Sequence, residues 1–167
     1  TRLKSWGLNF LRFLITWEAV EHQGPGQYDQ DYLDYLTQVV ELAGTHEMIL
    51  FIDPHQDVWS RFTGGDGAPG WVFEKLDMDL TKFHQAGAAF IHQESGDPYP
   101  RMIWSSNYSR YACATMWTLF FGGNTFAPDT FIDGTPVQDY LQGHYFNAVK
   151  QVAERLKDFP HVIGFDT

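Results

Sequence analysis

The apolar residues of the chain form short continuous runs that alternate with segments of helical periodicity. Residues 7–15 are almost all apolar, which is typical of a strand buried on both faces of a parallel sheet. After a loop rich in Gly and Pro, Asp29 is suited to cap a helix that Gly44 ends. Residues 48–52 then form a second apolar run. The order strand, helix, strand predicts a βαβ unit.

Another helix and a third strand follow a long segment without a clear period. Residues from about 59 to 135 mix glycine, aromatic and polar residues, and we expect them to form an insertion after the second strand. Within it, residues 108–121 fit a helix that the following glycine pair ends. An apolar stripe over residues 137–157 predicts a further helix, and residues 162–165 begin a strand. This alternation predicts a parallel α/β architecture, either a barrel or an open sheet.

Polar residues cluster where the second predicted strand ends. Asp53 begins this cluster, and His55, Gln56 and Asp57 complete it. The carboxyl ends of parallel strands are where α/β proteins build their active sites. The side chains of His55 and Asp57 are suited to bind sugar hydroxyls, and the same pair could also supply two metal ligands. A solvated turn capped by Asp53 is the alternative without a binding role.

Arg12 and several tryptophans are further candidates. Arg12 is the one charge in the first apolar run, and a buried guanidinium needs acceptors. We therefore expect a carboxylate partner, either on a neighbouring strand in a structural role or in an active site. Trp17 and Trp59 lie in predicted loops, where such rings either stack on sugars or pack the loops.

The composition of the chain indicates which kinds of ligand or partner it can bind and in which compartment it lies. The chain has 21 acidic and 11 basic residues and a net charge of −10, which disfavours nucleic acids and anionic lipid surfaces as partners. Aromatic residues make up 17% of the chain, a surplus that suits a flat ligand such as a sugar. No apolar run approaches the roughly 18 residues of a membrane span, and peripheral membrane contact stays compatible with the pattern. The single cysteine, Cys113, favours a reducing compartment, and we expect an intracellular protein of the cytoplasm or vacuole.

Taken together, four motifs resemble family 5 glycoside hydrolases of the endoglycoceramidase-related branch. Two of them contain the candidate residues already named, and the other two are similar to fungal steryl β-glucosidases and glucosylceramidases. The motifs are LRFLITWEAVE at 11–21, IDPHQDVWSR at 52–61, GGDGAPGW at 64–71 and LFFGG at 119–123.

The resemblance implies a (β/α)₈ barrel, in which residues 1–167 form one partial domain with about strands two to four. It also implies retaining hydrolysis of a glucosylated lipid, a steryl β-glucoside first and glucosylceramide second, without a metal or organic cofactor. The acid/base and nucleophile glutamates are expected beyond Thr167, so residues 1–167 alone would be inactive. A non-catalytic carbohydrate-binding barrel and a metal-dependent hydrolase are the alternatives.

The resemblance extends to individual residues. Arg12 resembles an arginine near the nucleophile, whose charge would favour the ionised carboxylate. His55 and Asp57 resemble a pair that binds hydroxyls of the glucose next to the cleaved bond. Gln56 and Trp59 lie beside this pair in the sequence, where we expect them to shape the mouth for the aglycone. Trp17 remains a candidate for stacking on the sugar.

Overall fold

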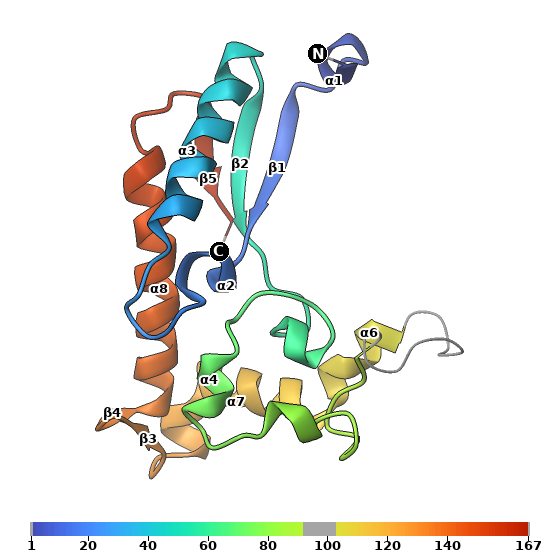
Figure 1. The fold of residues 1–167 in the computed structure, drawn as a ribbon, viewed down its shortest axis with the longest axis vertical. Coiled ribbons are helices and arrows are strands. Elements are labelled where there is room, and N and C mark those ends of the chain that lie inside the picture. Colours follow the sequence, from blue (N-terminus) through green and yellow to red (C-terminus); the bar gives the residue numbers. More distant parts are fainter. Residues whose placement is uncertain (1, 92–102, 167) are drawn as a thin grey trace.

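The computed structural model describes residues 2–91 and 103–166, and a parallel sheet lies at its centre. Its strands are β1 (Phe10–Ile15), β2 (Ile49–Pro54) and β5 (Val162–Phe165), with β2 in the middle (Figure 1). The predicted order of strands and helices is therefore confirmed. The other elements are α1 (Arg2–Ser5), α2 (Trp17–Glu21), α3 (Gln30–Thr45), η1 (Arg61–Thr63), α4 (Trp71–Glu74), η2 (Leu80–Lys82), α6 (Ile103–Ser106), η3 (Asn107–Ser109), α7 (Tyr111–Phe126), β3 (Phe131–Ile132), β4 (Thr135–Pro136) and α8 (Val137–Leu156).

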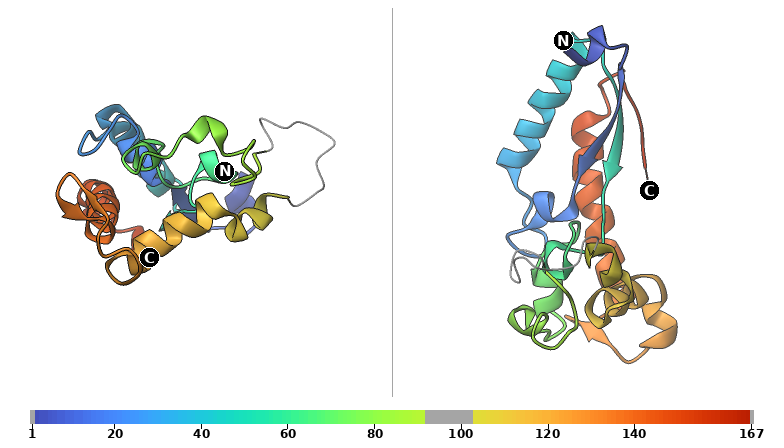
Figure 2. Two further views of the ribbon diagram at one scale, coloured as in Figure 1. Left: turned by 90° about the horizontal axis from the view of Figure 1, so that it is seen from below. Right: turned by 90° about the vertical axis from the view of Figure 1, so that its right-hand side faces the viewer.

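The two long connecting helices, α3 and α8, lie on the same face of the sheet (Figure 2). The predicted cap is confirmed, because the Asp29 carboxylate accepts a hydrogen bond from the Tyr32 N–H at 2.8 Å. On the other face, Phe10, Arg12 and Leu14 of β1 are each at least half exposed. Within the described residues the helices cover only one face of the sheet, so burial of β1 on both faces is not seen there.

The segment between β2 and α8 lies at the carboxyl ends of the strands (Figure 1). Its longest helix is α7, which begins three residues later than predicted and continues to Phe126. The predicted glycine pair marks a kink in this helix, although the helix does not end there. Gly122 departs from helical geometry with φ of −139°, yet helical hydrogen bonding resumes, and the Ala127 N–H reaches the Gly123 carbonyl at 2.8 Å.

A buried carboxylate, Glu21, ties several segments together. Glu21 is fully buried at the end of α2, and it accepts hydrogen bonds from Trp17 Nε1 and the Gly26 N–H, each at 2.6 Å. The same carboxylate lies 2.8 Å from His144 Nδ1 on α8. Its backbone carbonyl accepts a hydrogen bond from Trp71 Nε1 at 2.7 Å. These partners replace the hydration that the carboxylate loses on burial.

The loop after β2 turns back on itself at Asp57. Val58 and Trp59 have positive φ angles of 44° and 77°, a left-handed conformation that is costly for a β-branched residue. The backbone of Asp57 pairs with that of Asp66 in an antiparallel bridge, with N···O distances of 3.2 and 3.0 Å. Gly65 lies so close to the carbonyl oxygen of Asp57 that a Cβ does not fit there. The loop thereby fixes the backbone of Asp57.

We expect Glu21→Gln to lower the free energy of unfolding of the intact protein by about 2 kcal/mol or more. The amide has the size of the carboxylate, but its NH₂ group can only donate hydrogen bonds. It would therefore face one of the groups that donate to Glu21 and leave that hydrogen bond unmade. Denaturant titration measures the change. Glu41→Gln, at an exposed position of α3, is the matched control and should have little effect. Equal stability of the two variants would contradict the role given to Glu21.

Gly65→Ala should lower the melting temperature, because the added Cβ would overlap the carbonyl oxygen of Asp57. The control is Gly143→Ala, inside α8, where no neighbouring atom lies within 4 Å of the added Cβ. This second variant should be as stable as the wild type or gain about 0.5–1 kcal/mol from helix propensity. Differential scanning calorimetry compares the two, and a harmless Gly65→Ala would show that the close approach is not required.

Candidate active site

A cavity of about 690 Å³ opens at the carboxyl ends of the three strands. Residues at or just after the ends of β2 and β5, together with Arg12 inside β1, supply its polar side, which we call the floor. Aromatic side chains of α7 and α8 supply the other side, which we call the wall. The floor consists of Arg12, Asp53, Pro54, His55, Gln56, Asp57 and Asp166, and the wall of Trp117, Phe120, Phe121, Tyr145 and Phe146.

Parallel pairing brings the floor residues together. The His55 N–H donates to the Ile15 carbonyl at 2.7 Å, and the Asp166 N–H donates to the Ile52 carbonyl at 2.7 Å. These bonds continue the pairing of the strands past their ends. Side chains from positions 12 to 166 of the chain therefore line one cavity, which includes the polar cluster predicted after the second strand.

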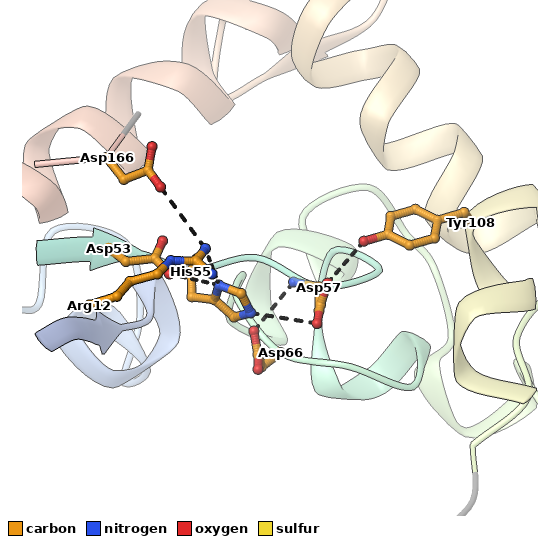
Figure 3. Close-up of polar contacts among 7 residues, drawn as sticks. All are labelled: Arg12, Asp53, His55, Asp57, Asp66, Tyr108 and Asp166. Atoms are coloured by element: carbon orange, nitrogen blue, oxygen red, sulfur yellow. Dashed lines mark hydrogen bonds and ion pairs between the residues drawn. The ribbon is translucent and has the colours of Figure 1, made fainter. Parts of the chain in front are cut away.

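Ion pairs and hydrogen bonds link the floor residues in a chain (Figure 3). Asp53 Oδ2 lies 2.7 Å from Arg12 Nη2 and 3.0 Å from His55 Nδ1. On its other side, the imidazole presents Nε2 to Asp57 Oδ2 at 3.5 Å. The buried Asp53 thus orients both Arg12 and His55, and His55 is left with one ring nitrogen toward Asp57.

The structure places Arg12 only partly as expected. Its partner is the carboxylate of Asp53 on the neighbouring strand, so the predicted ion pair is confirmed. Asp166 lies at 4.0 Å as a second, weaker partner. Within the described residues, 55% of the Arg12 side chain is exposed, on the face of the sheet that the helices leave uncovered.

Asp57 has a further partner that the sequence did not indicate. Tyr108 Oη donates a hydrogen bond to Asp57 Oδ1 at 3.0 Å (Figure 3). Burial raises the pKa of the Tyr108 phenol, and the charge of Asp57 adds to the increase, so the phenol keeps its proton at neutral pH. The two residues are 51 positions apart, and Tyr108 lies in the segment without a clear period. Only the tertiary fold brings them together.

The wall presents flat apolar surface to the cavity. The rings of Trp117 and Phe121 stack with centroids 5.5 Å apart and an interplanar angle of 13°. Phe121 and Phe146 line the cavity and stay largely exposed. Burial raises the pKa of the Tyr145 phenol, so this side chain is neutral at physiological pH. The wall is therefore uncharged, in contrast to the floor.

The sequence-predicted residues divide into two groups. His55, Gln56 and Asp57 line the cavity as expected, together with Arg12. Trp17 and Trp59 do not, because both are almost fully buried in the core. Of the two roles that the sequence left open for these rings, stacking on a sugar or packing, the structure shows packing.

The two tryptophans instead support the wall from behind. Trp17 packs edge-on against Tyr145 at 5.9 Å between centroids. Trp59 packs against Trp117 at 5.0 Å and against Phe120 at 5.6 Å. Such edge-to-face contacts hold the wall residues in place. Trp17 begins α2 and does not lie in a loop as predicted, whereas Trp59 shows that a loop position without periodicity is compatible with full burial.

Two kinds of feature are missing from residues 2–91 and 103–166. No three His, Cys, Asp or Glu side chains in this part of the chain are grouped so that they could hold a metal ion. No helix in it has both the length and the apolar character needed to cross a membrane.

Known proteins resemble this chain over nearly its whole length. It is 46% identical to a glucosylceramidase from Rhizopus delemar, in an alignment that covers 99% of this chain and 25% of that protein. Sterylglucosidase 1 of Cryptococcus neoformans, solved with tris, matches with a TM-score of 0.95 and 42% identity over 99% of this chain and 25% of that structure. The chain thus spans about a quarter of the length of these relatives.

A more distant solved structure shares the same architecture. It is endo-glycoceramidase II from Rhodococcus sp., captured as a lactosyl-enzyme intermediate, with a TM-score of 0.66 and 29% identity. The alignment covers 96% of this chain and 32% of that structure. The family model described as cellulase (glycosyl hydrolase family 5) matches residues 1–167. The chain therefore belongs to glycosyl hydrolase family 5.

Proposed function

We propose that the intact protein is a retaining β-glucosidase that acts on glucosylated lipids, steryl β-glucosides first and glucosylceramide second. The cavity carries this proposal, because it joins a hydrogen-bonding floor to an aromatic wall. A glucosylated lipid has the same two halves, namely a sugar rich in hydroxyl groups and an apolar aglycone. The names of the similar proteins, a glucosylceramidase and a sterylglucosidase, support this substrate class.

Residues 1–167 fit one partial domain that contributes about strands two to four of a (β/α)₈ barrel. Parallel strands, connecting helices on one face and a cavity at the carboxyl ends support this assignment. Residues from about 59 to 135 would then be an insertion in the loop after β2. This insertion would supply α7, and with it much of the wall.

The floor is assigned to the glucose. His55 and Asp57 offer donor and acceptor atoms that suit neighbouring sugar hydroxyls, and Gln56 adds an amide at the same edge. Hydrogen bonds of this kind raise turnover when they strengthen as the sugar approaches the transition state. Arg12 would lie near the catalytic nucleophile, where its charge favours the ionised carboxylate. The wall, with its flat rings, is assigned to the aglycone.

Catalysis would proceed with retention. The nucleophile carboxylate attacks the anomeric carbon while the acid protonates the departing lipid oxygen, and water then hydrolyses the glycosyl-enzyme with the same residue acting as base. Two carboxyl groups roughly 5–5.5 Å apart serve this course. The lactosyl-enzyme form of the Rhodococcus relative supports it. Both glutamates are expected beyond Thr167, so residues 1–167 alone would be inactive, and no step is assigned to a metal or organic cofactor.

Substituting the floor residues tests the glucose site. We expect His55→Ala and Asp57→Ala, each made in the full-length enzyme, to lower kcat/KM by about 100-fold or more while the melting temperature stays close to that of the wild type. His46→Ala, at an exposed position just after α3, is the control and should keep wild-type turnover. Near wild-type turnover in either floor variant would remove that residue from the glucose site.

The function itself is tested by glucose release from steryl β-glucoside and from glucosylceramide, with and without a chelator. Chelator-resistant release is the expected result, and the two rates rank the lipids. Activity that the chelator abolishes would favour a metal-dependent hydrolase that uses His55 and Asp57. Sugar binding without release from either lipid would favour a non-catalytic carbohydrate-binding barrel.

A further inference from the structure

We propose that Tyr108 is a positioning residue that holds the Asp57 carboxylate in the orientation required for sugar binding. This inference rests on the proposed function, because it assigns a purpose to Asp57 in the same site. Tyr108 does not itself line the cavity, whereas Asp57 does. Any effect of Tyr108 on the substrate must therefore pass through Asp57.

The other contacts of Asp57 fix its backbone but leave its side-chain carboxylate for Tyr108 to restrain. The backbone of Asp57 is fixed by the bridge to Asp66, so the remaining freedom of the residue is rotation of its side chain. Oδ2 faces His55 Nε2 at 3.5 Å, which is too long for a strong hydrogen bond. Oδ1 accepts the Tyr108 hydroxyl at 3.0 Å. The firmer restraint on the carboxylate therefore comes from Tyr108, through a hydrogen bond to a charged acceptor.

Tyr108 can restrain Asp57 because its own backbone is anchored. The preceding residue, Asn107, is fully buried, and its side-chain amide donates to the Phe90 carbonyl at 2.8 Å and accepts from the Phe90 N–H at 2.7 Å. A Cβ at Gly64 would lie 2.5 Å from the Asn107 amide nitrogen, so only glycine leaves space for this anchor. Arg110 adds a cation–π contact at 4.0 Å to the Phe90 ring.

The resulting chain of contacts runs from the segment after β2 to the strand β1. Tyr108 contacts Asp57, Asp57 faces His55, and His55 shares Asp53 with Arg12 (Figure 3). Loss of the phenolic hydroxyl would release one end of this chain. The carboxylate would then sample rotamers that do not meet the sugar hydroxyls, and catalysis is sensitive to displacements of this kind.

The test is a double-mutant cycle in the full-length enzyme, with glucose release from the better lipid substrate as the readout. We expect Tyr108→Phe to lower kcat/KM about tenfold without changing the melting temperature. In an Asp57→Ala background, the same substitution should have almost no further effect, because the acceptor through which Tyr108 acts is gone. Tyr111→Phe, at a ring that is 82% exposed, is the matched control and should behave like the wild type.

Two results would overturn the inference while leaving the proposed function intact. One is a wild-type rate for Tyr108→Phe in an enzyme that Asp57→Ala impairs. The other is an equal loss from Tyr108→Phe in both backgrounds, since a merely structural role is independent of the carboxylate.

Titration calorimetry with isofagomine, a glucose-like imino sugar, distinguishes failure of the positioning role of Tyr108 from failure of the proposed glucosidase function. Weaker binding by Tyr108→Phe, but not by Tyr111→Phe, would support the positioning role. A wild-type protein that neither binds isofagomine nor releases glucose would overturn the proposed function, and the inference with it.

Discussion

The carboxylate of Glu21, fully buried at the end of α2, joins parts of the chain that are far apart in the sequence. Its contact with His144 matters most for the site, because Tyr145 and Phe146 follow directly on α8. A fixed position for His144 sets the rotation of α8 about its axis. The contact between Glu21 and His144 therefore stabilises the core and also orients Tyr145 and Phe146 toward the cavity.

Local patterns in the sequence were sufficient to predict the framework. Continuous apolar runs gave the positions of the strands, and the Asp29 cap marked the start of α3 to the residue. His55 and Asp57 could be predicted as neighbours in a cavity because they directly follow a strand, and parallel strands collect such residues at one edge. These inferences need only the period of the pattern and the geometry of parallel pairing.

Features that depend on contacts between distant segments could not be predicted. Trp17 and Trp59 lie outside the predicted periodic segments, and only tertiary packing, of α8 against Trp17 and of α7 against Trp59, explains their burial. Tyr108 reaches Asp57 across 51 positions, and no local signal marks that pairing.

The bridge between Asp57 and Asp66 also bears on how this region can change during evolution. Surface loops usually accept insertions and deletions, because few contacts depend on their length. Here both ends of the loop are paired backbone to backbone, and Val58 and Trp59 already hold left-handed conformations within it. A single added or deleted residue would shift the register of the bridge and displace Asp57. Related sequences should therefore conserve the length of this loop, together with the glycines at positions 64 and 65.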